Sequence, residues 1–383
     1  MSQKPRFTLA APLAVLLFAL PYVVQAGPYT FTNIADSSGL FSGFFTVAPV
    51  NASGTVAFSA LLDTGGSGGI FTGSGGPTTT IADPSGPFAF FSEDVSINAS
   101  GTVAFRAFPD AGGQGIFTGS GGPTTTIASS SGPFVDFDRI SINASGTVAF
   151  FALRDAGGEG IFTGSGGPTT TIADLSPSSA IGGLSINDAG TVAFLGGQVA
   201  GRVGIFTGSG GALTTIADPS GPVAGFSSFP SINASGTVAF FGRDGVFTGS
   251  GGPTTTIVDS SGPFASFGTF SEVSINAGGT VAFGATLDAG GQGIFTSDDL
   301  SHPVIAIGDA LFGSTLVGFS FVSEKGLNDA GQVAFLYVLA DDRQGIARAD
   351  PVVAGVPEPG TLALLAASLG ALAWRARRGR RAH

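Results

Sequence analysis

Residues 98–105 read Asn98-Ala99-Ser100-Gly101-Thr102-Val103-Ala104-Phe105, and their pattern, Asn-x-x-Gly-x-x-Ala-Phe, occurs seven times in this chain of 383 residues. An asparagine side chain can hydrogen-bond within its own turn, and glycine can adopt a positive φ, so the pattern predicts a tight hairpin between two strands. The asparagines are Asn51, Asn98, Asn143, Asn187, Asn233, Asn276 and Asn328, spaced 43 to 52 residues apart. We interpret them as structural turn residues.

Two further elements follow each asparagine, typified by Gly-Ile-Phe-Thr-Gly and Thr-Thr-Thr-Ile-Ala-Asp. With the segment before each asparagine, every unit reads as four short strands rich in β-branched and aromatic residues. In the fifth unit the loop between the second and third strands shrinks to Asp244-Gly245. Because so short a loop can join only antiparallel neighbours, each unit is predicted to be an antiparallel sheet.

Seven four-stranded units of this length predict an all-β, seven-bladed β-propeller. A β-solenoid is the alternative, although its coils are usually shorter and need capping ends. The repeat begins with a fourth strand at residues 31–35 and ends with a third strand at residues 345–348. The N-terminal strand is therefore expected to complete the last blade and to close the ring.

Both ends of the chain carry targeting features. Lys4 and Arg6 precede an apolar stretch over residues 9–24, which predicts a signal peptide over residues 1–26. At the other end, Pro357-Glu358-Pro359 precede an apolar run over residues 361–374, too short to cross a bilayer comfortably, and five arginines. Residues 27–350 are left for the propeller and 351–356 for a linker. The chain has no cysteine, so no disulfide is expected.

The C-terminal segment, residues 357–383, resembles the PEP-CTERM sorting signal of Gram-negative bacteria. Its motif residues are Pro357, Glu358 and Pro359, followed by a short transmembrane helix and by Arg375, Arg377 and Arg378. The resemblance implies an exosortase as a processing partner, and the predicted signal peptide implies signal peptidase as another. It also implies transient anchoring in the inner membrane, removal of the tail, and delivery to the cell surface or the extracellular polymer matrix.

Between the targeting ends lie 25 acidic and 8 basic residues, a net charge of −17. This sign argues against nucleic acid as a partner and favours cations or a cationic polymer. A surface polysaccharide is a further candidate partner for a protein at the cell surface. Strand order places 20 of these acids in loops on one face. They are Asp36, Asp63, Asp83, Glu93, Asp94, Asp110, Asp136, Asp138, Asp155, Glu159, Asp174, Asp218, Asp244, Asp259, Glu272, Asp288, Asp309, Glu324, Asp341 and Asp342.

These acids admit two interpretations. Hard carboxylate oxygens suit Ca²⁺, which makes a calcium-binding face conceivable. However, the loop aspartates that follow the fourth strand are mostly trailed by Ser and Gly, as turn chemistry requires. No EF-hand or glycine-rich calcium repeat is present in the sequence, so turn formation is the favoured interpretation and no metal ligand is assigned.

The repeat itself resembles that of the choice-of-anchor tandem repeat proteins, which implies surface display and no enzymatic activity. The chain has only His302 and His383, which argues against a serine triad or a histidine metal site. We therefore predict no catalytic residues and no cofactor, and a surface or matrix protein that acts as a non-catalytic interaction scaffold. Two alternatives stay open: a carbohydrate-active propeller enzyme using loop carboxylates, and a calcium-binding structural surface protein.

Overall fold

The computed structural model of the protein describes residues 29–63, 68–175, 182–197, 203–223, 225–268 and 272–352. The predicted signal peptide, residues 1–26, and the predicted sorting segment, residues 357–383 with its helix over 361–374, lie outside the described residues. Within those residues no helix is long and apolar enough to span a lipid bilayer. The regular structure described is entirely β.

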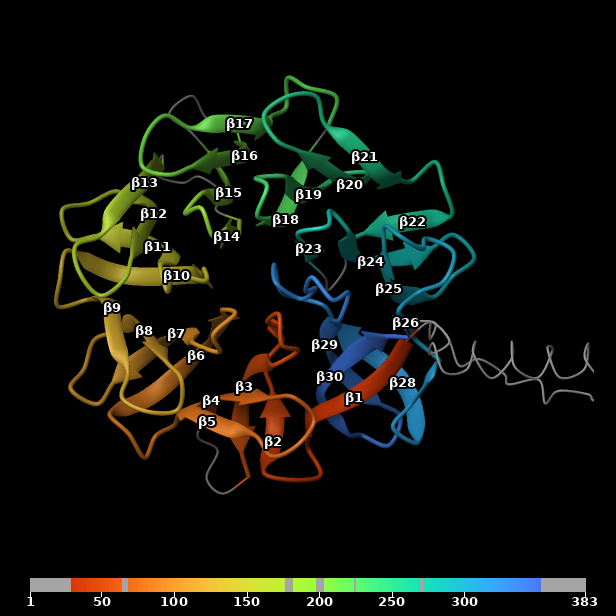
Figure 1. Ribbon diagram of the computed structural model, residues 1–383, viewed down its shortest axis with the longest axis horizontal. Helices are drawn as coiled ribbons and strands as arrows, with labels where there is room; N and C mark the ends of the chain where they lie inside the picture. Colours follow the sequence, from red (N-terminus) through yellow and green to blue (C-terminus); the bar gives the residue numbers. More distant parts are fainter. Residues whose placement is uncertain are drawn as a thin grey trace, which may run out of the picture.

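The chain folds into seven antiparallel sheets arranged radially around a central axis (Figure 1). From the axis outward, blades 1 to 3 contain β2 (Phe41–Phe44), β3 (Val56–Leu62), β4 (Gly68–Gly73) and β5 (Thr79–Ala82); β6 (Phe88–Ile97), β7 (Val103–Pro109), β8 (Gly115–Gly119) and β9 (Thr125–Ser129); and β10 (Phe134–Ile142), β11 (Val148–Arg154), β12 (Glu159–Gly164) and β13 (Thr170–Leu175).

Blades 4 to 6 repeat this order. They contain β14 (Leu184–Ile186), β15 (Val192–Gly197), β16 (Val203–Gly208) and β17 (Thr214–Ala217); β18 (Phe226–Ile232), β19 (Val238–Gly242), β20 (Gly245–Gly249) and β21 (Thr255–Asp259); and β22 (Phe264–Phe267) with β23 (Val273–Ile275), β24 (Val281–Leu287), β25 (Gln292–Thr296) and β26 (Ile305–Ala306). In blade 6 both β22 and β23 pair with β24, so the inner strand is divided into two pieces.

Blade 7 joins the two ends of the described chain. It contains β27 (Ala310–Leu311), β28 (Ser314–Ser320), β29 (Val333–Leu339), β30 (Gln344–Pro351) and, as its outer strand, β1 (Tyr29–Asp36). The pairing of β1 with β30 runs from Tyr29 opposite Pro351 to Asp36 opposite Gly345, and Figure 1 shows the red first strand beside the blue last one. The predicted seven-bladed propeller and its closure by the N-terminal strand are confirmed.

The hairpin between the first two strands of each blade is built as the repeat predicts. The glycine of every Asn-x-x-Gly turn has φ between +76° and +88°, a region that residues with a Cβ atom rarely adopt. Its amide donates to the carbonyl of the repeat asparagine, as in Gly146 to Asn143 at 3.0 Å. The seven hairpins lie on one face of the propeller, at the inner edges of the blades.

Phenylalanines fill the spaces between the blades. In blade 3, Phe150 stacks on Phe162 with ring centroids 5.8 Å apart, and Phe134 meets Phe162 edge-on at 4.9 Å. The same arrangement recurs in blades 1, 2 and 6. Phe150 belongs to a buried cluster that also contains Ala104, Ile116 and Ile127 of blade 2. The hydrophobic core is therefore a ring of inter-blade layers, and each blade depends on its neighbours.

Replacing Phe150 by alanine is expected to lower the free energy of unfolding by about 3–5 kcal/mol, because its ring is fully buried and its neighbours cannot fill the void. Guanidinium unfolding measures the change. Phe90→Ala is the matched control: this ring is 69% exposed, so its loss is expected to change stability by about 0.5 kcal/mol or less. Equal effects of the two variants would contradict the inter-blade core.

Candidate functional site

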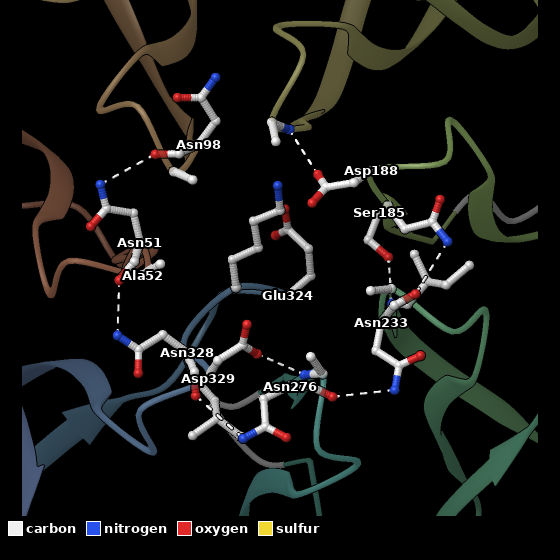
Figure 2. A pocket seen from close by; sticks show the side chains of 18 of the residues that line it. Asn51, Ala52, Asn98, Ser185, Asp188, Asn233, Asn276, Glu324, Asn328 and Asp329 are labelled. Atoms are coloured by element: carbon white, nitrogen blue, oxygen red, sulfur yellow. Dashed lines mark hydrogen bonds between the residues drawn. The ribbon is translucent and has the colours of Figure 1, made fainter.

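The seven repeat asparagines form a closed ring of hydrogen bonds around the propeller axis. Each side-chain Nδ2 donates to the backbone carbonyl of the asparagine in the next blade, over 2.8–3.3 Å. The last bond, from Asn328 Nδ2 to the Asn51 carbonyl, closes the ring (Figure 2). Each Oδ1 accepts the backbone amide four residues later, which fixes the hairpin.

A second ring lies next to the first and is incomplete. In blades 2 to 6 the residue two positions before the asparagine is a serine, whose Oγ accepts the backbone amide of the residue before the asparagine in the next blade. Pro49 and Gly326 occupy the equivalent positions in blades 1 and 7. Where blade 7 meets blade 1, the Val50 amide instead donates to the Lys325 carbonyl at 2.9 Å.

Residues 321–327 of blade 7, which we call the plug, cross the central channel. The Glu324 carbonyl accepts hydrogen bonds from Ser231 Oγ at 2.7 Å and from Ser274 Oγ at 3.2 Å. Lys325 Nζ reaches across to blade 3 and donates to the Ile142 carbonyl. Figure 2 shows Glu324 in the middle of the ring of asparagines. The plug therefore contacts four other blades and occupies the place where a propeller can bring residues from all its blades together.

The plug separates two cavities. The one on the hairpin face has a volume of about 180 Å³ and is lined by six of the seven ring asparagines, Lys325, Glu324, Asp188 and Asp329. Asp188 and Asp329 each accept a backbone amide from the preceding blade, at 2.8 and 2.7 Å. The other cavity has a volume of about 20 Å³, which is the space of one water molecule.

Ionisable side chains gather around the smaller cavity. Asp94, Glu272 and Glu324 are 8, 5 and 8% exposed. Arg139, whose φ of +49° falls at a β-bulge in β10, places its guanidinium 4.3 Å from the centre of the Phe229 ring and 3.9 Å from Asp94 Oδ1. Among the described residues, Glu324 Oε1 is a buried oxygen with no hydrogen-bond partner. The cluster thus holds more carboxylates than cations.

Burial shifts the protonation of these groups. Desolvation, strengthened by the nearby Glu324 carboxylate, raises the pKa of Glu272 well above its ordinary value. Desolvation also raises the pKa of Glu324 to about 6, although the Lys325 ammonium and a hydrogen bond with Ser141 oppose the shift. The pKa of Asp94 is raised by burial and by Asp138, against the opposing effect of Arg139. The pKa of Lys325 is lowered by burial.

The predicted acidic loop face requires a correction. Asp94, Glu272 and Glu324 were expected there, but they are buried in the channel. Asp36, Asp83, Asp218 and Asp259 do lie in turns after outer strands, and each accepts both the amide and the hydroxyl of the serine two residues later. Those carboxylates serve their own turns. Within the described ranges no three acidic or histidine side chains are grouped so that they could hold a metal ion.

Sequence reasoning missed the plug, although the sequence contains a signal for it. The spacing of 52 residues before Asn328 is the longest in the chain, and Lys325-Gly326-Leu327 replace the usual x-Ser-Ile before the asparagine. Pro357, Glu358, Pro359, Arg375, Arg377 and Arg378 lie outside the described residues. The repeat asparagines converge on the axis, where each makes contacts both within its own blade and with the next.

Replacing Asn143 by alanine is expected to lower the free energy of unfolding by about 2 kcal/mol or more. It removes the donor to the buried Asn187 carbonyl and the acceptor for the Thr147 amide, and an unpaired buried polar group costs about 1–3 kcal/mol. Ser145→Ala, which removes only an exposed hydroxyl bound to the same Asn143 Oδ1, is the control. If both variants unfold at the same denaturant concentration, the ring contributes nothing to stability.

Stability is expected to fall as pH rises from about 4.5 to above 6. Because the pKa values of Glu272 and Glu324 are raised in the folded state, the folded protein binds protons that the unfolded chain has released in this range. The exposed or half-buried aspartates with lowered pKa values, such as Asp36 and Asp350, act only at lower pH. Melting temperatures measured across this range test the direction.

Glu272→Gln is expected to flatten this dependence and to raise the melting temperature at neutral pH, since the amide needs no charge in the channel. Asp110→Asn, at an exposed loop carboxylate, is the control and should leave the profile unchanged. A wild-type melting temperature that rises from pH 4.5 to 7 would contradict the assignment of buried, proton-binding carboxylates.

Comparison with solved structures shows similarity in fold alone. A prolyl endopeptidase matches with a TM-score of 0.52 and 14% identity, over 82% of this chain and 51% of its own. An oligogalacturonate lyase from Vibrio parahaemolyticus matches with a TM-score of 0.52 and 10% identity, over 84% of this chain and 97% of its own. The present chain thus spans about half the length of the endopeptidase. No curated protein matches it in sequence.

Two family profiles match the sequence. Residues 355–378 match the PEP-CTERM protein-sorting motif, which confirms the predicted sorting signal. The second profile covers residues 32–363, almost the whole propeller and the segment after it, and gives no support for the narrower resemblance to choice-of-anchor tandem repeat proteins. The chain belongs to the family of unknown function DUF7453.

Proposed function

We propose that this protein is exported, sorted by an exosortase to the cell surface or the extracellular polymer matrix, and acts there as a non-catalytic propeller scaffold. The sorting motif over residues 355–378 supports the destination. The predicted signal peptide over residues 1–26 supplies the export step. Display on one of several anchors, as the repeat resemblance implies, is part of this proposal.

The plug is the observation that carries the non-catalytic role. It occupies the axis, and the cavity beside the carboxylate cluster has a volume of about 20 Å³, too small for any substrate beyond water. The carboxylates of a glycosidase must flank a sugar ring, and Glu272 and Glu324 have no room for one between them and the neighbouring blades. The backbones of these two residues hold the plug instead: the Glu272 amide donates to the Phe321 carbonyl at 2.6 Å, and the Glu324 carbonyl accepts from Ser231 Oγ and Ser274 Oγ.

The calcium alternative finds less support than the scaffold. Four of the loop aspartates that could have been ligands, Asp36, Asp83, Asp218 and Asp259, each use one carboxylate oxygen to accept two hydrogen bonds from a serine. Asp174 is engaged by Arg154, and Asp309 accepts the Ala306 amide. Turn formation is therefore sufficient to explain their presence.

Replacing Pro357, Glu358 and Pro359 together by alanine is expected to block release. The uncut protein should remain in the membrane fraction at higher apparent mass, because the apolar run and the arginines stay attached. Immunoblots of fractionated cells measure the distribution. Val353→Ala, four residues before the motif, is the control and should be processed as the wild type is.

Two outcomes would overturn the proposal. Normal processing and release of the triple variant would remove the exosortase step. Saturable hydrolytic turnover by the purified wild-type protein, abolished in Glu272→Gln while the fold survives, would replace the scaffold by an enzyme.

A further inference from the structure

Two equivalent grooves lie on the outer part of the propeller, at junctions between blades. The first, about 330 Å³, lies between β5 of blade 1 and the loop after β8 of blade 2. The second, about 320 Å³, lies between β17 of blade 4 and the loop after β20 of blade 5. Both volumes fall in the range of small-ligand sites. Neither groove involves the channel or the plug.

The same repeat positions line both grooves. In the first they include Thr80, Asp83, Ser85, Gly122, Pro123 and Thr124. In the second they include Thr215, Asp218, Ser220, Gly252, Pro253 and Thr254. Because the two sets come from corresponding repeats, the groove is a property of the repeating unit rather than an accident of one loop.

Neighbouring blades approach each other closely next to each groove. Gly121 has a φ of +93°, and a Cβ atom there would lie 3.3 Å from Thr79 Cγ2. Gly251, with a φ of +95°, approaches Thr214 in the same way. The contact recurs at the junctions of Gly75 with Thr32, Gly166 with Thr125 and Gly210 with Thr170. Five of the seven junctions thus share one construction.

The chemistry of the lining selects the kind of ligand. Each groove offers threonine and serine hydroxyls, which donate and accept, together with one carboxylate that already accepts two hydrogen bonds from a serine. No Lys, Arg or His is among the described residues that line either groove, so an anion has no counter-charge. A single carboxylate is a poor metal site. The exposed Pro123 and Pro253 side chains add apolar surface beside the hydroxyls.

We propose that these junction grooves bind neutral saccharide units, so that one propeller holds a polysaccharide through several equivalent sites. A sugar presents hydroxyls that both donate and accept, and C–H faces that suit the apolar part of the lining. Repetition around the ring converts weak single sites into strong attachment to a polymer. The inference rests on the proposed surface or matrix location and gives the scaffold its partner.

The test fills two grooves without straining the fold. Gly122 and Gly252 have no positive φ, and a Cβ atom at either would meet nothing within 4 Å, so the double variant Gly122→Tyr, Gly252→Tyr is expected to fold. Ala111→Tyr, in an exposed loop between β7 and β8, adds the same ring elsewhere and is the control. Melting curves of the three proteins check that each is folded.

The exported, processed protein and both variants are applied to an array carrying neutral hexose, uronate and amino-sugar oligosaccharides. Wild type and Ala111→Tyr are expected to bind neutral glycans saturably, and the double variant to lose about tenfold or more in apparent affinity as sites are removed from the multivalent set. Binding of no glycan, binding confined to uronates or amino sugars, or unchanged binding by the folded double variant would overturn the proposal. Because the array uses purified protein, these results are independent of the sorting experiment.

Discussion

The closed ring of seven asparagine side chains is the constraint on which the rest of this structure depends. Each carboxamide has two tasks: its oxygen fixes the hairpin of its own blade, and its nitrogen donates to the hairpin of the next. A blade therefore cannot be displaced from the axis without breaking a bond in its neighbour as well. The bond from Asn328 Nδ2 to the Asn51 carbonyl closes the ring after seven hairpins, so the ring also favours a propeller of seven blades. Asparagine is required because a carboxylate would lack the donor and a serine would lack the reach.

The second ring, formed by serine hydroxyls, is interrupted at blades 1 and 7, where the propeller closes. There a hydrogen bond to the plug replaces it. Gly326 and Pro49 have no hydroxyl to offer, but the extra length of blade 7 brings the Lys325 carbonyl to the Val50 amide. The segment that supports the closure is also the segment that fills the channel. Closure is thus reinforced twice: outside, by the pairing of β1 with β30, and inside, by a backbone loop held by serines of blades 5 and 6. The chain has no cysteine, so these non-covalent contacts hold the first and last strands of the propeller together without a disulfide.

Features that recur in every repeat can be predicted from the sequence, whereas features that occur only once cannot. Period, strand order, the glycine turns and the final strand that completes blade 7 could all be predicted, because each follows from a pattern that recurs seven times. Glu272, Glu324 and Arg139 could not be placed, because their positions depend on how far an irregular segment extends toward the axis. The two acids lie between the outer-strand isoleucine of one blade and the repeat asparagine of the next, as the exposed Glu93 and Asp174 do, and no local property of the sequence distinguishes them from those acids. The long spacing before Asn328 marks the irregular segment, but only packing against the other blades determines which of its side chains are buried.

The propeller therefore divides its surface between two kinds of chemistry. At the axis, buried carboxylates with raised pKa values lie near a half-buried lysine and an arginine with a positive φ, and serine hydroxyls hold the backbone of the plug. The plug leaves a cavity of only about 20 Å³ beside the buried carboxylates. The grooves at the rim are lined mainly by hydroxyls, glycines and prolines and carry little charge. Because these grooves are repeated, several weak contacts can add up to strong binding. A polymer such as a polysaccharide can meet several rim grooves at once, whereas the plug interrupts the path along the channel. The repeat that lets the ring close also repeats the grooves at its outer edge, so the interaction surface that we propose follows from the same physical constraint as the fold.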